Sequence, residues 1–286
     1  MKILVIGYSQ TGQLDRVVDS IIAPLEKIHE VDRVYLRPSS EFLFPWNFWT
    51  FFDTMPECVA EIPIDLEPVD VTSAGEYDVA ILAYQPWFLS PSLPVMSFVK
   101  SVAGRRLLDG LPVIEVIGCR NMWTVAQDRM RSLLQGAGAR VIDTVVLCDQ
   151  SGTFESFITT PRWMLTGRKE GLGLSPAGIS EENIRNSVRF GEAIAVAEPP
   201  FDASILQSLH PFDYDADLAH AERIGRRVFE FWSGCIRRCG KPGAWRRRPA
   251  VALFVASLFT SITVVLPIRL TIVHGIRGVR GLLKRG

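Results

Sequence analysis

The chain has 286 residues, of which 48% are hydrophobic, and its 31 basic and 31 acidic residues balance. This length allows one large buried core with appended segments. No acidic residue follows Glu230, whereas 11 of the basic residues lie beyond position 236. Because this positive charge is confined to an apolar tail, no nucleic acid is expected as a partner, and anionic membrane lipid is the expected partner of the tail.

The five cysteines form no paired framework, and the chain starts with an apolar, strand-like segment in place of a cleavable leader. These features predict a reducing, cytoplasmic compartment. Cys235 and Cys239 are four residues apart, but no second pair of ligands accompanies them in the sequence, so no metal site is predicted.

The first strand and the loop after it carry the strongest local pattern. An apolar run over residues 2–6 leads into residues 7–13, GYSQTGQ, and a helical pattern begins near Leu14. Hydroxyl groups and a glycine at the start of a helix suit a monophosphate, because the first backbone N–H groups of the helix are unpaired there. The loop is neither a Walker A motif nor a Gly-x-Gly-x-x-Gly motif. A helix start without a ligand is the alternative.

The next predicted elements are a helix over residues 13–29, a strand over 32–36 and an aromatic insert over 39–62. From Phe42 to Phe52 the insert has more apolar side chains than one helix face can bury. Two interpretations stay open. The insert covers the core as a buried helix and loop, or it forms a wall of a site for an apolar substrate.

A continuous apolar run over residues 77–83 predicts a strand buried on both faces of a parallel sheet. The loop after it contains Gln85, Pro86, Trp87 and Phe88 before a helix that reaches Val102. An aromatic ring here can stack on a planar ligand, and the prolines restrict the turn. Trp87 packed in the core is the alternative.

A fourth strand over residues 111–118 ends at an exit loop that begins Cys119-Arg120-Asn121. A helix over 124–135 and a fifth strand over 140–147 follow. Strands that alternate with helices predict an α/β fold with right-handed crossovers and a parallel sheet, and the loops after strands one, three and four then meet at its carboxyl edge. Cys119 beside Arg120 is either a candidate nucleophile with a lowered pKa or a small loop residue.

After residue 150 the pattern weakens. Residues 159–163 and 166–169 predict a polar, basic loop. Helices are predicted over 180–195, where Ser180 is followed by two glutamates, and over 215–235, which ends close to two arginines.

The sequence predicts three segments: a domain over residues 1–200, a helical and basic extension over 201–248, and an apolar segment with a basic tail over 249–286. The uncharged run 250–268 would be about 28 Å long as a helix, close to the thickness of a bilayer core. It predicts a membrane-spanning helix, an in-plane anchor, or a helix packed on the domain or on a partner.

Residues 8–13 resemble the first loop of flavodoxin-like proteins, in which Ser/Thr-x-Thr-Gly grips the phosphate of FMN. Residues 85–91 are similar to the loop that lies against the isoalloxazine ring in flavodoxins and NAD(P)H:quinone reductases. The resemblance implies a flavodoxin-like, doubly wound, parallel five-stranded sheet of order 2-1-3-4-5 with a helical C-terminal extension. It implies FMN as cofactor, held by Ser9, Gln10, Thr11, Gly12, Gln13, Gln85, Pro86, Trp87, Phe88, Gly118 and Asn121. One departure is Gln13, because flavodoxins usually end the first loop with a further Thr, Ser or Asn.

Taken together, residues 8–13, 44–46, 85–91, 118–123 and 160–163 resemble the dialkylresorcinol condensing enzymes of bacterial pigment pathways, of the aryl polyene and xanthomonadin type. This resemblance covers roughly residues 1–200. It implies an enzyme that acts on an apolar aromatic or acyl-type substrate beside other enzymes of its pathway. The expected chemistry is an FMN-assisted redox, aromatisation or condensation-associated step, in which Cys119 and Arg120 are the catalytic candidates.

Two other functions stay open. The first is an FMN-dependent oxidoreductase of the NAD(P)H:quinone type, with NAD(P)H as electron donor and, as is frequent among such reductases, a homodimer. The second is a scaffold without flavin that holds the pathway enzymes at the membrane.

Overall fold

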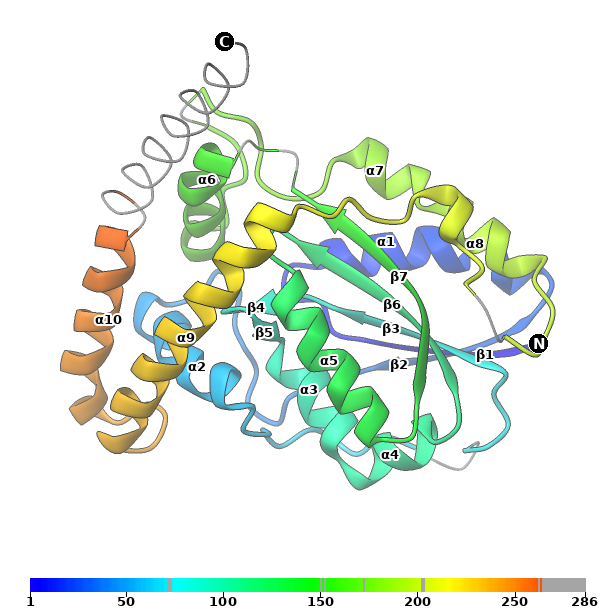
Figure 1. The fold of residues 1–286 in the computed structure, drawn as a ribbon, viewed down its shortest axis with the longest axis horizontal. Coiled ribbons are helices and arrows are strands. Elements are labelled where there is room, and N and C mark those ends of the chain that lie inside the picture. Colours follow the sequence, from blue (N-terminus) through cyan, green and yellow to red (C-terminus); the bar gives the residue numbers. More distant parts are fainter. Residues whose placement is uncertain are drawn as a thin grey trace, which may run out of the picture.

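The computed structural model describes residues 1–70, 74–149, 151, 153–171, 173–201, 204–261 and 263 (Figure 1). At its centre lies a five-stranded parallel sheet. Its strands are β1 (Lys2–Gly7), β2 (Glu30–Tyr35), β3 (Val79–Tyr84), β6 (Pro112–Cys119) and β7 (Arg140–Cys148), in the order β2-β1-β3-β6-β7. A two-stranded hairpin, β4 (Pro86–Trp87) and β5 (Ser90–Pro91), is separate from this sheet. The order is that of the flavodoxin-like doubly wound fold, as predicted.

Helices cover both faces of the sheet, so a hydrophobic core lies on each side (Figure 1). One face packs against α1 (Gln13–Ile22), α7 (Glu181–Asn186) and α8 (Val188–Ala195). The other packs against α3 (Leu93–Lys100), α4 (Val102–Leu108) and α5 (Thr124–Gly136). The central strand β3 is buried along its whole length, which explains its uninterrupted apolar sequence.

Local chemistry sets several helix boundaries. Helix α1 ends earlier than predicted because Pro24 follows it, and a short 3-10 turn, η1 (Leu25–Lys27), takes its place. The predicted helix through Val102 is divided into α3 and α4 at Ser101, whose hydroxyl accepts from the Gly104 N–H at 2.9 Å and so caps the second helix.

The aromatic insert contains a helix, α2 (Phe48–Ala60), that begins at Asn47. The prediction of a loop over residues 159–163 was wrong, because these residues lie within α6 (Thr153–Thr166). Packing outweighs the cost of Pro161 inside the helix: Trp163 is 8% exposed, and the N–H of Trp46 in the insert donates to the Met164 carbonyl at 2.8 Å.

The C-terminal extension is helical, as predicted. A short turn, η2 (Gln207–Leu209), precedes α9 (Ala216–Arg238), and η3 (Trp245–Arg247) leads into α10 (Arg248–Thr260). Helices α2, α9 and α10 share a small apolar core to which α10 contributes Val251, Phe254 and Val255. The buried guanidinium of Arg247 forms ion pairs with Asp53 at 2.8 Å and Glu57 at 2.9 Å on α2.

Among the described residues, no helix is long and apolar enough to cross a membrane. The predicted apolar run 250–268 falls only partly in this range. Residues 262 and 264–286, which include the end of that run and most of the basic tail, lie outside the described part of the chain.

Candidate functional site

A cavity of about 220 Å³ lies at the carboxyl edge of the sheet. The loops after β1, β3, β6 and β7 line it, together with the aromatic insert and α6. Ten residues singled out from the sequence meet there: Gln10, Thr11, Gln13, Gln85, Pro86, Trp87, Phe88, Gly118, Cys119 and Arg120. Ser9, Gly12 and Asn121 are not in the lining. The structure also adds Leu14, Trp46, Phe51, Asp149, Thr160, Trp163, Met164, Gly178 and Ile179.

Part of the lining is polar and incompletely paired. Trp46 and Thr160 line the cavity, and the buried indole N–H of the first and hydroxyl of the second have no hydrogen-bond partner within the described part of the chain. The hydroxyl of Ser9, one residue before the lining begins, is buried and equally without a described partner. Buried polar atoms are costly to leave unpaired, so these atoms indicate a ligand that supplies the missing bonds.

The start of α1 is built for an anion. Gly12 precedes the helix with φ 75°, a left-handed conformation that favours glycine, and as N-cap it offers no side chain to the helix. The Thr11 hydroxyl accepts from the Gln13 N–H at 3.5 Å, a long hydrogen bond. Gly12 faces open space, since a Cβ at this position would meet no atom within 4 Å. Thr11 lies beside it in the lining. Together with the positive end of the helix, this loop suits a phosphate group.

Gln13 has a different role from the hydroxyl residue that flavodoxins usually carry. Its side-chain amide donates to the Ile179 carbonyl and accepts from the Ile179 N–H, both at 2.9 Å. A Cβ on Gly178 would approach the Gln13 amide oxygen to 2.5 Å, so only glycine fits there. The Gln13 side chain therefore closes one side of the cavity, and these two bonds were not foreseen.

An aromatic wall bounds the cavity at Trp87. Edge-to-face contacts join the Trp87 ring to Phe42 at 5.2 Å, Trp46 at 5.4 Å and Tyr8 at 5.9 Å. Trp87 is 9% exposed and Trp46 is 4% exposed, yet both line the cavity. The same rings therefore pack in the core and form an apolar wall of the cavity.

Two charged residues that line the cavity, Arg120 and Asp149, interact electrostatically. Burial lowers the pKa of Arg120 to about 10, while the nearby Asp149 carboxylate acts in the opposite direction. Arg120 is therefore cationic at neutral pH. Asp149, directly after β7, accepts from the N–H groups of Ser151 and Gly178, both at 2.8 Å. Sequence reasoning missed Asp149, although its place after the fifth strand is equivalent to that of Arg120 beyond the fourth.

Cys119 does not have the lowered pKa that its neighbour Arg120 suggested. Burial raises the pKa of its thiol, and a hydrogen bond to Cys148 adds to the rise. The two sulfur atoms lie 3.4 Å apart. Cys148 was not identified from the sequence as a site residue.

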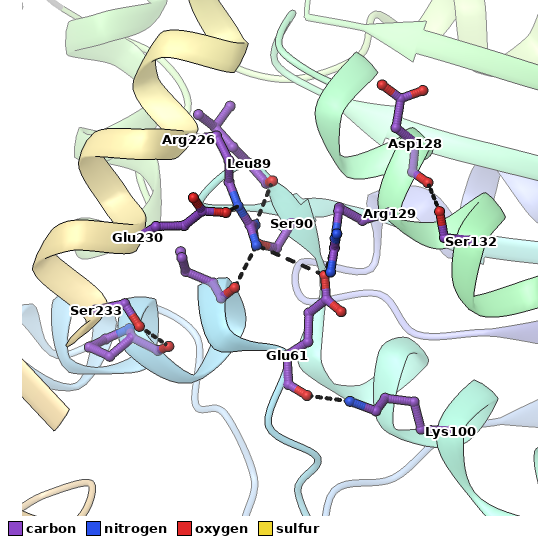
Figure 2. A network of polar contacts seen from close by, with 12 residues as sticks. Glu61, Leu89, Ser90, Lys100, Asp128, Arg129, Ser132, Arg226, Glu230 and Ser233 are labelled. Carbon is purple, nitrogen blue, oxygen red and sulfur yellow. Dashed lines mark hydrogen bonds and ion pairs between the residues drawn. The ribbon is translucent and has the colours of Figure 1, made fainter. Parts of the chain in front are cut away.

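Helix α9 of the C-terminal extension contacts Leu89 and Ser90 of the hairpin turn through Arg226 (Figure 2). Arg226 of α9 donates to the Leu89 carbonyl at 3.1 Å, to the Ser90 hydroxyl, and to the Val59 carbonyl at 2.5 Å. Phe88 and Leu89 have φ angles of 51° and 58°, which are strained for these side chains. Arg226 therefore stabilises a strained turn that places Phe88 in the lining.

Glu222, one turn earlier on α9, holds the next loop. Its carboxylate is fully buried and accepts from the Trp123 N–H at 3.1 Å and the Val125 N–H at 2.9 Å. These groups begin α5, directly after the loop that carries Arg120, so Glu222 caps this helix from another element. A glutamate and an arginine four residues apart on α9 were the only sequence signal for these contacts.

Protein-family models and curated proteins give no match to the sequence. Solved structures similar in fold include a flavoprotein in complex with FMN from Lactobacillus acidophilus NCFM, 14% identical, covering 51% of this chain and 92% of that protein, with a TM-score of 0.40. A flavodoxin from the domain Archaea is 12% identical, covers 68% and 96%, and has a TM-score of 0.38. Oxidised flavodoxin 1 from Bacillus cereus is 15% identical, covers 67% and 95%, and has a TM-score of 0.37. These values describe similarity of fold only.

Proposed function

We propose that the cavity binds FMN and that the protein is an FMN-dependent oxidoreductase. The observation that carries the proposal is one cavity at the carboxyl edge that combines a helix start with glycine as N-cap, unpaired hydroxyl and indole groups, and a wall of indole rings. FMN has a phosphate, which suits the helix start, and a planar aromatic ring system, which suits the wall of indole rings. When bound, FMN supplies hydride and electron transfer.

Each part of the lining then has a defined task. The backbone of residues 9–13 and the Thr11 hydroxyl hold the phosphate. The rings of Trp46 and Trp87 exclude water and restrict the position of an apolar ring. Arg120, which stays cationic in the cavity, would stabilise negative charge on a bound ring system.

We further propose an apolar aromatic or acyl-type substrate, with NAD(P)H as electron donor. The support is the apolar character of the wall that faces the cavity. An FMN-assisted redox or aromatisation step in an aryl polyene or dialkylresorcinol-type pathway fits such a substrate. Anionic lipid is proposed as a partner of the C-terminal region, because Trp245 and Leu253 are 71% and 62% exposed close to Arg246 and Arg248.

Flavin binding is tested directly with the purified full-length protein. We expect flavin absorbance on purification, or saturable quenching of tryptophan fluorescence when FMN is added. Gly12→Val should weaken FMN binding at least tenfold, which corresponds to about 1.4 kcal/mol. Gly75→Val is the matched control, because Gly75 also has a positive φ with open space at its Cβ but precedes β3, at the amino edge of the sheet and away from the cavity.

Riboflavin, which lacks the phosphate, separates the two halves of the site. It should bind to the wild-type protein at least tenfold more weakly than FMN, and equally weakly to the Gly12→Val variant. A wild-type protein that neither carries flavin nor gains it from added FMN contradicts the proposed function. Equal FMN affinity in the Gly12 and Gly75 variants contradicts the phosphate assignment alone.

A further inference from the structure

Cys119 and Cys148 are the last residues of β6 and β7, and the two strands are parallel neighbours in the sheet. Their register places these residues directly opposite each other, with the sulfur atoms 3.4 Å apart. Neighbouring strands lie about 4.8 Å apart, within the Cα separation that a disulfide spans. Bond formation therefore requires the sulfur atoms to approach by only about 1.4 Å, to the usual S–S length of about 2.0 Å.

One cysteine of the pair also reaches the cavity. Cys119 is part of the lining, and both cysteines are half-buried. Of the other described cysteines, Cys58 is fully buried, while Cys239 donates to the backbone carbonyl of Cys235. Redox chemistry at Cys119 and Cys148 therefore takes place beside the cavity.

The hydrogen bond between the thiols divides their roles. It lowers the pKa of Cys148 and, together with burial, raises that of Cys119. When Cys148 is ionised, the Cys119 S–H donates to the Cys148 sulfur. Cys148 is then the better thiolate, and Cys119 is the proton donor next to the cavity.

We propose that Cys119 and Cys148 form a redox-active dithiol–disulfide pair that exchanges two electrons with the flavin in the adjacent cavity. In the oxidising direction two S–H bonds break and one S–S bond forms. The two electrons and two protons reduce oxidised flavin to dihydroflavin, and the reverse reaction restores both thiols. The flavin half of this proposal rests on the proposed function, whereas disulfide formation does not.

The bond would join two walls of the cavity. Cys119 leads into Arg120, and Cys148 leads into Asp149, which holds Gly178. The redox state of the pair therefore acts on both charged residues of the site.

Disulfide formation is tested without flavin. The full-length protein is equilibrated in buffers with rising ratios of oxidised to reduced dithiothreitol, free thiols are alkylated, and peptides are identified by mass spectrometry. We expect the Cys119 and Cys148 peptides to lose their labels together and to appear as one cross-linked species. Cys148→Ser and Cys119→Ser should each abolish it, while Cys239→Ser should leave it unchanged. If Cys119 and Cys148 are still labelled independently of each other in oxidised dithiothreitol, the proposed disulfide is wrong.

Electron exchange is tested by anaerobic reductive titration of the disulfide form with FMN bound, followed by flavin absorbance. The wild type should take up twice as many electrons per flavin as Cys148→Ser, which carries no disulfide. Cys119→Ser reports the same outcome if Cys148→Ser does not fold. Equal electron uptake by the two proteins would contradict electron exchange between the pair and the flavin, but not FMN binding. A protein that binds no FMN would contradict the flavin part of the proposal, and the thiol-labelling experiment would still test disulfide formation.

Discussion

Replacing Arg226 by methionine is expected to destabilise the protein and to loosen the cavity wall at Phe88. The substitution keeps an unbranched side chain on α9 but removes every donor of the guanidinium. The carbonyl oxygens of Val59 and Leu89 then lose a buried partner, and the turn loses its bond at Ser90 (Figure 2).

Burial sets the magnitude of this loss. The Arg226 side chain is 9% exposed, whereas that of its ion-pair partner Glu230 is 55% exposed, so this pair contributes little. Its second ion-pair partner, the buried Glu61 at 3.9 Å, keeps its closer partner Arg129. Each buried carbonyl left without a donor costs about 1–3 kcal/mol. Relaxation of the strained Phe88–Leu89 turn offsets part of this cost and moves Phe88 away from the cavity. We expect the free energy of unfolding to fall by about 2–4 kcal/mol.

Urea denaturation followed by tryptophan fluorescence measures the stability, and FMN titration at low temperature measures the site. Arg227→Met is the matched control: Arg227 is the next residue on α9 and exposed, so its replacement should change stability by no more than about 0.5 kcal/mol. FMN affinity should fall at least tenfold in Arg226→Met only. Equal stability and equal affinity in the two variants would refute the role of α9 in the site.

Three further changes test other contacts. Burial raises the pKa of Glu115, so the folded state binds more protons than the unfolded state, and wild-type stability falls as pH rises from about 4.5 through the raised value. Glu115→Gln should flatten this fall in urea denaturation. The control Glu26→Gln, at an exposed position, should not. Gln13→Ala leaves both backbone groups of Ile179 without their partner, so we expect a loss of about 1–3 kcal/mol and faster proteolysis near residue 178. Glu222→Ala removes the cap of α5 and should cost about 1–2 kcal/mol of stability in the same denaturation experiment. Slower amide exchange at residues 123–125 in this variant would contradict the role of Glu222 as a cap.

Local sequence patterns determined the core of this fold. Apolar runs separated by helical periodicity predicted five parallel strands, and right-handed crossovers leave few ways to arrange them. The same rule brought the loops after β1, β3 and β6 to one edge, so ten of the singled-out residues line one cavity. The positive φ of Gly12 at the start of α1 agrees with its place in the phosphate-like loop.

Contacts between distant segments were decided only by the tertiary structure. Arg226 meets Leu89 across 137 positions, and Gln13 meets Ile179 across 166. No local period encodes such pairs, because their geometry depends on how α9 and the 177–179 segment pack on the finished sheet. Helix α6 formed around Pro161 for the same reason, since burial of Trp163 outweighed the local preference.

The cysteines illustrate which features the sequence predicts and which depend on the tertiary structure. The sequence placed Cys119 at a strand exit, and it suggested a lowered pKa from the adjacent Arg120. Only the register of β6 and β7 puts Cys148 opposite Cys119, and only burial in the assembled sheet raises the pKa of the Cys119 thiol. Strand register and burial are properties of the packed molecule, because each depends on residues far away in the chain.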